Sequence, residues 1–214
     1  MIIDLHTHTL PWSDDSQLYP VDLIDHAKQA GLDGICLTEH DWFWETSRVA
    51  ELSQEHDFLI LPGVEINTEE GHLLVFGLEK YVFGMHHAAV VRQLVDEVGG
   101  AIILAHPHRR QFPSYGSDES DYYPALERAC NNPVFELVDG VEVLNGRASP
   151  EKNAFSLELS RKSSSRGCGG SDAHGASDLG SAATLFQRQI SCLKDLITEL
   201  KAGRFTAVSL RQGL

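Results

Sequence analysis

The sequence IIDLHTHTLPWSDD, residues 2–15, contains the pattern on which the interpretation of the whole chain depends. Its first residues are mostly apolar and are typical of a short buried strand. His6 and His8 lie two positions apart, so in an extended backbone their side chains point to the same side. Paired imidazoles at the end of a strand are typical of a metal site. One such pair is weak evidence by itself, so further ligands must come from other segments of the chain.

The composition is that of an ordinary globular protein. The chain has 214 residues, of which 42% are hydrophobic and 22% are charged, and this length is sufficient for one sizeable domain. No segment approaches the roughly 20 consecutive apolar residues that a membrane helix needs. The N-terminus also lacks the basic region of a signal peptide. We therefore expect a single domain, residues 1–214, in the cytoplasm and without a membrane partner.

The balance of charges and ligand-type residues indicates which partners and metals to expect. A formal net charge of −14 argues against stable binding of duplex nucleic acid, because such binding relies on Lys and Arg to neutralise phosphates. Carboxylates that bind cations would account for part of this negative charge. Eleven histidines outnumber four cysteines that have no CxxC spacing. Nitrogen and oxygen ligands without thiolates favour Zn, Mn or Fe.

Short apolar runs alternate with amphipathic segments along the chain. The expected strands are residues 2–5, 34–38, 58–61 (continuing into PGVEI), 72–77, 101–105, 140–144 and 182–186. The expected helices are residues 20–31, 42–56, 85–98, 121–130, 150–163 and 191–202. The run RKSSSRGCGG, residues 161–170, is interpreted as a loop. Strands that alternate with helices predict an α/β fold with βα units around a parallel sheet.

Ligand-type residues follow nearly every expected strand. They are His6 and His8, then Glu39, His40 and Asp41, then Glu65, then His106 and His108, and finally Asp172 and His174. His72 is the exception, because it lies at the start of its strand. Each residue alone has a structural explanation, such as a hydrogen-bonded histidine or a helix cap. In a parallel barrel, however, the carboxyl ends of all strands meet on one face, so together these residues favour a metal site.

The number of candidate ligands indicates more than one ion. The roughly nine candidates exceed the four ligands of a tetrahedral site. Two or three ions that share a bridging carboxylate account for them most economically. Such a cluster polarises a phosphoryl oxygen and lowers the pKa of a bridging water to near neutrality, which suits attack on a phosphate ester.

Six segments of the chain together resemble a known family. DLHTHT, LTEHD, PGVEIN, AHPHR, EVLNGR and GGSDAHG occur in this order and resemble the PHP (polymerase and histidinol phosphatase) family over essentially the whole chain. The resemblance implies a distorted seven-stranded (β/α) TIM-like barrel. It also implies a trinuclear metal site and phosphoesterase activity with divalent transition metals.

The resemblance further implies which residues hold each ion. The first ion is assigned to His6, His8, Glu65 and Asp172, the second to Asp14, His40 and His174, and the third to Glu65, His72 and His106. The family often has its aspartate five residues after the second histidine, where this chain has Ser13. Members with one additional residue in this segment favour Asp14 over Asp15.

The implied mechanism is attack on phosphorus by a metal-bridging hydroxide held by Glu65, Asp172 and His174. Arg109 and Arg147 are candidates for bidentate contacts to phosphate, although either can equally be a surface arginine. His108 is a third candidate for contact with the substrate. The expected substrate is a small phosphomonoester, a nucleotide or a short oligonucleotide.

Two alternative functions stay open at this point. One is an amidohydrolase-like site that acts on a substrate without phosphate. The other is a metal-binding PHP module that has no catalytic activity. The apolar stripe of the expected helix at 191–202 does not indicate an oligomeric state.

Overall fold

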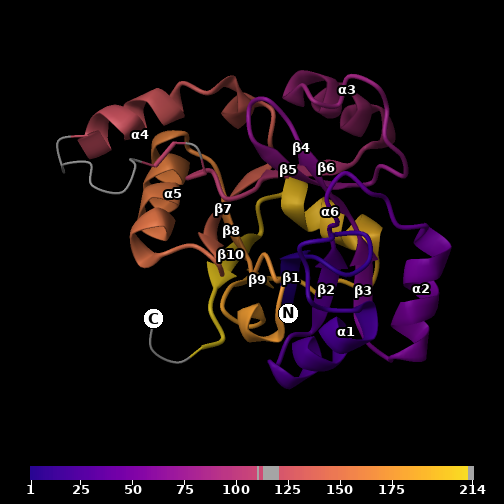
Figure 1. The fold of residues 1–214 in the computed structure, drawn as a ribbon. Helices are drawn as coiled ribbons and strands as arrows, with labels where there is room; N and C mark the ends of the chain where they lie inside the picture. The colour runs from indigo at the N-terminus through magenta and orange to yellow at the C-terminus, as the bar shows by residue number, and fades with distance from the viewer. Residues whose placement is uncertain (110, 113–120, 212–214) are drawn as a thin grey trace.

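In the part of the chain that the structure describes, ten strands form two sheets and six α-helices pack around them (Figure 1). The computed structural model describes residues 1–109, 111–112 and 121–211. The helices are α1 (Pro20–Gln29), α2 (Thr46–Glu55), α3 (Ala88–Val98), α4 (Tyr122–Cys130), α5 (Pro150–Lys162) and α6 (Leu193–Lys201). None of these described helices has the length and apolar character required to cross a membrane.

The first sheet has the strand order β10-β9-β1-β2-β3. Its strands are β1 (Ile2–Thr7), β2 (Gly34–Leu37), β3 (Leu59–Pro62), β9 (Ala183–Phe186) and β10 (Phe205–Val208). Strands β1, β2 and β3 run parallel, whereas β9 runs antiparallel to both β1 and β10.

The second sheet has the strand order β4-β5-β6-β7-β8. Its strands are β4 (Val64–Asn67), β5 (His72–Phe76), β6 (Ala101–Leu104), β7 (Gly140–Asn145) and β8 (Gly167–Gly170). Strands β6, β7 and β8 run parallel, whereas β5 runs antiparallel to β4 and β6.

The prediction of a seven-stranded TIM-like barrel is wrong, although the α/β class is confirmed. The described residues form two mixed five-stranded sheets, and no closed ring of paired strands is found among them. The segment expected as one strand from residue 58 is in fact β3 and β4, which belong to different sheets. The sequence interpretation also missed β8, because three of its four residues are glycine and glycine is rare in strands, and it missed β10.

The chain passes from the first sheet to the second at Gly63. A Cβ atom at this position would lie 2.8 Å from Cε1 of Phe76 and 2.9 Å from Cγ2 of Thr38. Only glycine allows so close an approach, and it leaves β3 and β4 at the edges of separate sheets. The sheets still touch nearby, because an isolated parallel bridge pairs His40 with Glu65.

A side chain joins the two sheets where β8 approaches β9. The Gly169 N–H donates to Oγ1 of Thr184 over 3.0 Å, and the Thr184 hydroxyl donates to the Gly169 carbonyl over 2.7 Å. A threonine hydroxyl therefore makes contacts that backbone groups make within a ladder. This arrangement is one physical reason why β8 and β9 are not paired as neighbouring strands of one sheet.

Both sheets contribute to one central core. In β5, Leu74 and Phe76 face this core, whereas the alternate residues Leu73 and Val75 pack in a second cluster with α3. This alternation follows from the two-residue period of a strand. Leu196 of α6 packs in the central core with Phe76, at the end of β5 opposite to His72. The core thus leaves the His72 edge of the sheets free for polar residues.

The hydroxyl contact between β8 and β9 leads to a stability prediction. Thr184→Val keeps the volume of the buried side chain but removes both hydrogen bonds to Gly169. We expect the free energy of unfolding to fall by about 1–3 kcal/mol, measured by urea denaturation. The matched control is Thr206→Val at an exposed position of β10, where the expected change is within about 0.5 kcal/mol. Equal effects of the two substitutions would contradict the assigned role of Thr184.

Candidate metal centre

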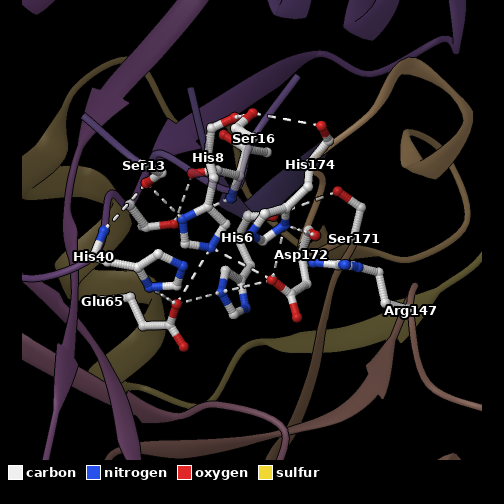
Figure 2. A network of polar contacts seen from close by, with 12 residues as sticks. His6, His8, Ser13, Ser16, His40, Glu65, Arg147, Ser171, Asp172 and His174 are labelled. Carbon is white, nitrogen blue, oxygen red and sulfur yellow. Dashed lines mark hydrogen bonds and ion pairs between the residues drawn. The ribbon is translucent and has the colours of Figure 1, made fainter. Parts of the chain in front are cut away.

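Histidines and carboxylates from both sheets converge at one edge of the fold (Figure 2). From the first sheet come His6 in β1, His8 directly after it, and His40 after β2. From the second sheet come Glu65 in β4, His72 at the start of β5, His106 after β6, and Asp172 and His174 after β8. The structure therefore brings together eight of the nine residues to which the resemblance assigns an ion.

His72 reaches this edge because its strand runs in the opposite direction to its neighbours. Strand β5 pairs antiparallel with β4, where His72 lies opposite Asn67, and with β6, where Leu73 lies opposite Leu104. The start of β5 is therefore beside the carboxyl ends of β4 and β6. A ligand at the start of an antiparallel strand meets ligands at the ends of its neighbours.

Four buried ligand atoms converge at the innermost point of the cluster. Nε2 of His6 lies 3.2 Å from Oε2 of Glu65 and 3.5 Å from Oδ1 of Asp172, and Nε2 of His8 lies 3.3 and 3.4 Å from the same two oxygens. Within the described part of the chain, none of these four atoms has a hydrogen-bond partner. Buried polar atoms without partners are costly unless something else compensates them.

A divalent cation is the group that these four atoms fit. Ligands about 2.0–2.1 Å from a tetrahedral ion lie about 3.4 Å apart, which agrees with the four separations of 3.2–3.5 Å. Two imidazoles and two carboxylates are also a donor set that Zn, Mn or Fe accepts. The residues present therefore fit the metal that the sequence predicts.

Glu65 links this group of atoms to a second group of histidines. Its Oε2 atom faces His6, His8 and also Nδ1 of His40, at 3.0 Å. Its Oε1 atom lies 2.8 Å from Nδ1 of His72 and 2.9 Å from Nε2 of His106. The two oxygens of one carboxylate thus face different sets of imidazoles, as a bridging ligand requires.

Asp15, rather than Asp14, lies close to His40 and His174. Oδ2 of Asp15 lies 3.1 Å from Nε2 of His174, and Oδ1 lies 3.6 Å from Nε2 of His40. Among the described residues no such contact is found for Asp14, so the geometry favours Asp15 over the aspartate that the family spacing favours. The reason is local: Ser16 donates its N–H to the Ser13 carbonyl, and this turn directs Asp15 back toward the imidazoles.

Hydrogen bonds at Nδ1 determine how two of the imidazoles present Nε2. Nδ1 of His6 lies 3.0 Å from Oε1 of Glu142, and Nδ1 of His174 lies 2.8 Å from the Asp172 carbonyl oxygen. Because both partners are acceptors, each Nδ1 carries the hydrogen and donates it. The lone pair of each Nε2 is then free for a cation.

His8 is oriented in the same way through a serine. Its Nδ1 lies 3.2 Å from Oγ of Ser13, and the Ser13 hydroxyl donates to Oε2 of Glu39 over 2.6 Å. The serine oxygen therefore accepts the Nδ1 hydrogen of His8. Glu39 is in turn held by the Thr9 N–H at 2.8 Å and by Nε1 of Trp44 at 3.2 Å.

Glu142 is a residue of the candidate centre that the sequence interpretation missed. Its side chain is buried in β7, and besides His6 it accepts the His106 N–H at 2.8 Å and the Asn145 amide at 2.9 Å. A Cβ atom at Gly170 would lie 2.6 Å from Oε1 of Glu142 and 2.5 Å from Cβ of His6, so glycine there leaves room for their contact. A single carboxylate within the apolar run GVEVL was the available signal, because a buried acid requires partners.

The electrostatics of the cluster favour cation binding. Burial raises the pKa of Glu65. The adjacent His6, His106 and His40 lower it by more than burial raises it, so the pKa lies well below its usual value. Burial opposes charge on His6, but the carboxylates of Asp172, Glu142 and Glu65 raise its pKa well above the usual value. A cation that binds here must therefore displace a proton from His6.

The three predicted substrate contacts have different surroundings. Arg109 donates to Oδ2 of Asp172 over 2.6 Å and is 41% exposed. Arg147 is exposed, and its charge contributes to the lowered pKa of His174, after burial and His8. His108 is 95% buried against Ser156 of α5, with Nδ1 3.2 Å from the serine Oγ.

A pocket adjoins the side of the cluster formed by His72 and His106. Arg109 also lines it, together with Leu104, Phe135 and Leu159 as apolar walls and Glu69 and Glu70 as acidic residues. His108 is not among the lining residues. The pocket therefore offers space next to candidate metal ligands, and Arg109 contributes a positive charge to its lining.

Comparison with models of known families identifies the family to which the chain belongs. A model of the PHP domain matches residues 4–135, and a model described as PHP-associated matches residues 150–205. The chain belongs to the PHP family. The resemblance inferred from the six sequence segments is thereby confirmed.

The individual proteins that this chain resembles are distant from it in sequence. An uncharacterized protein of Methanocaldococcus jannaschii is 27% identical over 156 residues, which cover 68% of this chain and 82% of that protein. A two-domain protein of Bacteroides vulgatus contains a predicted PHP-like metal-dependent phosphoesterase; its structure matches with a TM-score of 0.67 and 20% identity, over 98% of this chain and 64% of that chain. An amidohydrolase of Chromobacterium violaceum, with bound sulfate and no metal, matches with a TM-score of 0.57 and 16% identity over 98% of both chains. At these identities the two structures show the fold alone.

The position of Asp15 in this PHP protein leads to a paired test. Asp15→Asn removes a carboxylate that faces His40 and His174, whereas Asp14→Asn changes an exposed neighbour. We expect Asp15→Asn to bind about one metal ion fewer per chain at saturation, measured by elemental analysis after dialysis against Mn²⁺ or Zn²⁺. Asp14→Asn is expected to bind as many ions as the unmodified protein. The reverse result would restore Asp14 as the ligand.

Glu142 provides a second test. Glu142→Gln keeps the shape of the side chain but removes the charge that orients His6, so we expect metal affinity to fall roughly 10- to 100-fold. The measurement is competition with a chromophoric chelator. The control is Glu97→Gln at an exposed position of α3, which should leave affinity unchanged. A Glu142→Gln affinity equal to that of the control would show that the contact with His6 is only structural.

Proposed function

We propose that this PHP protein hydrolyses a phosphate ester with the help of bound divalent transition metals. The observation that carries the proposal is the convergence of four buried, partnerless ligand atoms from His6, His8, Glu65 and Asp172. In a chain of the PHP family, such a set is most simply explained as a metal site. The pocket beside it supplies the space in which an ester can bind.

We propose two or three ions, Zn, Mn or Fe. The three groups that would hold them are His6, His8, Glu65 and Asp172; His40, His174 and Asp15; and Glu65, His72 and His106. Bound cations would neutralise phosphoryl oxygens and supply a water that is acidic enough to attack phosphorus near neutral pH. Glu65 supports a shared arrangement, because its two oxygens face different histidines.

Arg109 is the best candidate for binding the phosphate. It lines the pocket and contacts Oδ2 of Asp172 through one nitrogen, which leaves other guanidinium donors for an anionic ligand. An arginine at this position favours a phosphate ester over a neutral amide substrate. Arg147 is a second cation near the site, because its charge helps to lower the pKa of His174.

His108 is better suited to hold structure than to transfer protons. Burial, together with the neighbouring His106, lowers its pKa to about 4. The imidazole is therefore neutral at physiological pH and does not act as a cationic proton donor. Its contact with Ser156 anchors the segment after β6, which carries His106 and Arg109, to α5.

The residues that line the pocket support a class of substrate. Its apolar walls, Leu104, Phe135 and Leu159, would contact the uncharged part of an ester, while Arg109 would bind the phosphate. This arrangement supports a small phosphomonoester, a nucleotide or the end of a short oligonucleotide. We do not propose a duplex nucleic acid, because the net charge of −14 opposes it.

The function is tested by phosphate release from metal-loaded protein. With Mn²⁺ or Zn²⁺ we expect turnover of p-nitrophenyl phosphate or of at least one nucleotide or sugar phosphate, and we expect a chelator to abolish it. Arg109→Gln should raise KM roughly 10- to 100-fold, since it removes a charge-assisted hydrogen bond, whereas Arg48→Gln on the exposed face of α2 should not. Full metal occupancy without turnover across the panel would refute the proposal.

A further inference from the structure

Glu69, His86 and His87 form a second cluster of metal-ligating side chains outside the candidate metal centre. Glu69 lies in the turn between β4 and β5, and the two histidines directly precede α3. One ligand atom from each of the three residues lies within 4.8 Å of the others. Of the four such groups found in the described ranges, this one alone shares no residue with the centre.

One distance in this cluster is close to the separation between two ligands of one cation. Nδ1 of His87 lies 3.5 Å from Oε2 of Glu69, near the separation of about 3.4 Å between two ligands of a tetrahedral ion. The two imidazole rings are adjacent, with centroids 4.1 Å apart. The side chains of His87 and Glu69 are 46% and 69% exposed, so an ion from solution can reach them and keep water as its remaining ligands.

Backbone contacts hold the two contributing segments in place. The Glu69 N–H donates to the His86 carbonyl over 2.9 Å, and the His87 N–H donates to the Gly84 carbonyl over 3.0 Å. The Ala88 N–H, at the start of α3, donates to Oε2 of Glu70 over 2.9 Å. Because the backbones are already fixed, binding costs mainly the rotamer freedom of three side chains.

Glu70 also weakens the electrostatic repulsion between the start of α3 and a cation. The N-terminus of a helix carries a partial positive charge that repels a cation. A carboxylate bonded to the first N–H of α3 offsets this charge next to His86 and His87. The surroundings of the cluster are therefore compatible with a bound cation.

We propose that Glu69, His86 and His87 bind one zinc-type divalent cation in a solvent-accessible site that is separate from the PHP centre. Two imidazoles and a carboxylate, without a thiolate, suit Zn, Cu or Ni better than Mg or Ca. The exposed ligands make this the more readily exchanged site, in contrast to the fully buried atoms of His6, His8 and Glu65.

A cation bound at this site would also change the electrostatics of the pocket. Glu69 lines the pocket together with Glu70, and two carboxylates there oppose the approach of an anionic ester. A cation on Glu69 reduces this repulsion. The consequence rests on the proposed function, whereas the binding of the cation does not.

The test is a count of bound zinc in the full chain, by equilibrium dialysis after removal of metals with a chelator. We expect the double variant His86→Asn/His87→Asn to bind about one Zn²⁺ fewer per chain than the unmodified protein at saturation. The matched control is His26→Asn/His56→Asn, whose partly exposed histidines belong to none of the four groups. It should bind as many ions as the unmodified protein. Circular dichroism spectra verify that each variant is folded.

Two results would overturn the proposal. One is an equal zinc count for the unmodified protein and His86→Asn/His87→Asn, and the other is an equal loss in the control. A third variant, Glu69→Gln, should weaken binding of the additional ion without changing the count for the buried centre. Because the count is measured without substrate, it separates this proposal from the phosphoesterase proposal: either can fail while the other holds.

Discussion

The candidate metal centre is organised around one buried carboxylate, Glu65. It lies in β4, at the edge of the second sheet, and both of its oxygens face histidines. A buried charge of this kind is tolerated only when it is paired or bound to a cation. The imidazoles that surround it come from β1, from the residues after β2 and β6, and from the start of β5, so this one carboxylate connects segments of both sheets. Removal of either its charge or its partners would leave uncompensated charge in the interior.

Other buried carboxylates orient the candidate ligands through hydrogen bonds. Glu142 orients His6, and Glu39 orients His8 through Ser13. Asp4 accepts the N–H groups of His6 and Ser171, and burial raises its pKa to about 7. These acids do not face the innermost ligand atoms themselves. Their hydrogen bonds fix ring orientation and tautomer, so the cost of preparing a metal site is met during folding rather than on binding.

The strand directions explain why one edge of the fold serves as a site. The carboxyl ends of the parallel strands and the start of antiparallel β5 lie at the same edge. Backbone strain marks this edge as well, because His106 and Asp172 have φ values of 25° and 54°, a region that non-glycine residues occupy at a cost of about 1–3 kcal/mol. The Glu142 carboxylate holds the N–H of His106 in that conformation. Such strain persists only where surrounding contacts over-determine the backbone.

The sequence alone determined the local properties of the protein: six helices, most strands, the α/β class, the PHP family and most of the candidate ligands. These follow from residue type, periodicity and the positions of histidines and acids relative to strand ends, all of which are recorded within short segments. Tertiary structure decided what depends on distant partners. The break between β3 and β4 depends on Phe76 and Thr38 packing against Gly63, and β8 is a strand despite its glycines because β7 pairs with it. The choice of Asp15 over Asp14 depends on where His40 and His174 lie, and Glu142 becomes recognisable only beside His6. Spacing along a chain specifies which side chains can point the same way, but not which segments meet, since that is decided by packing between residues far apart in the sequence.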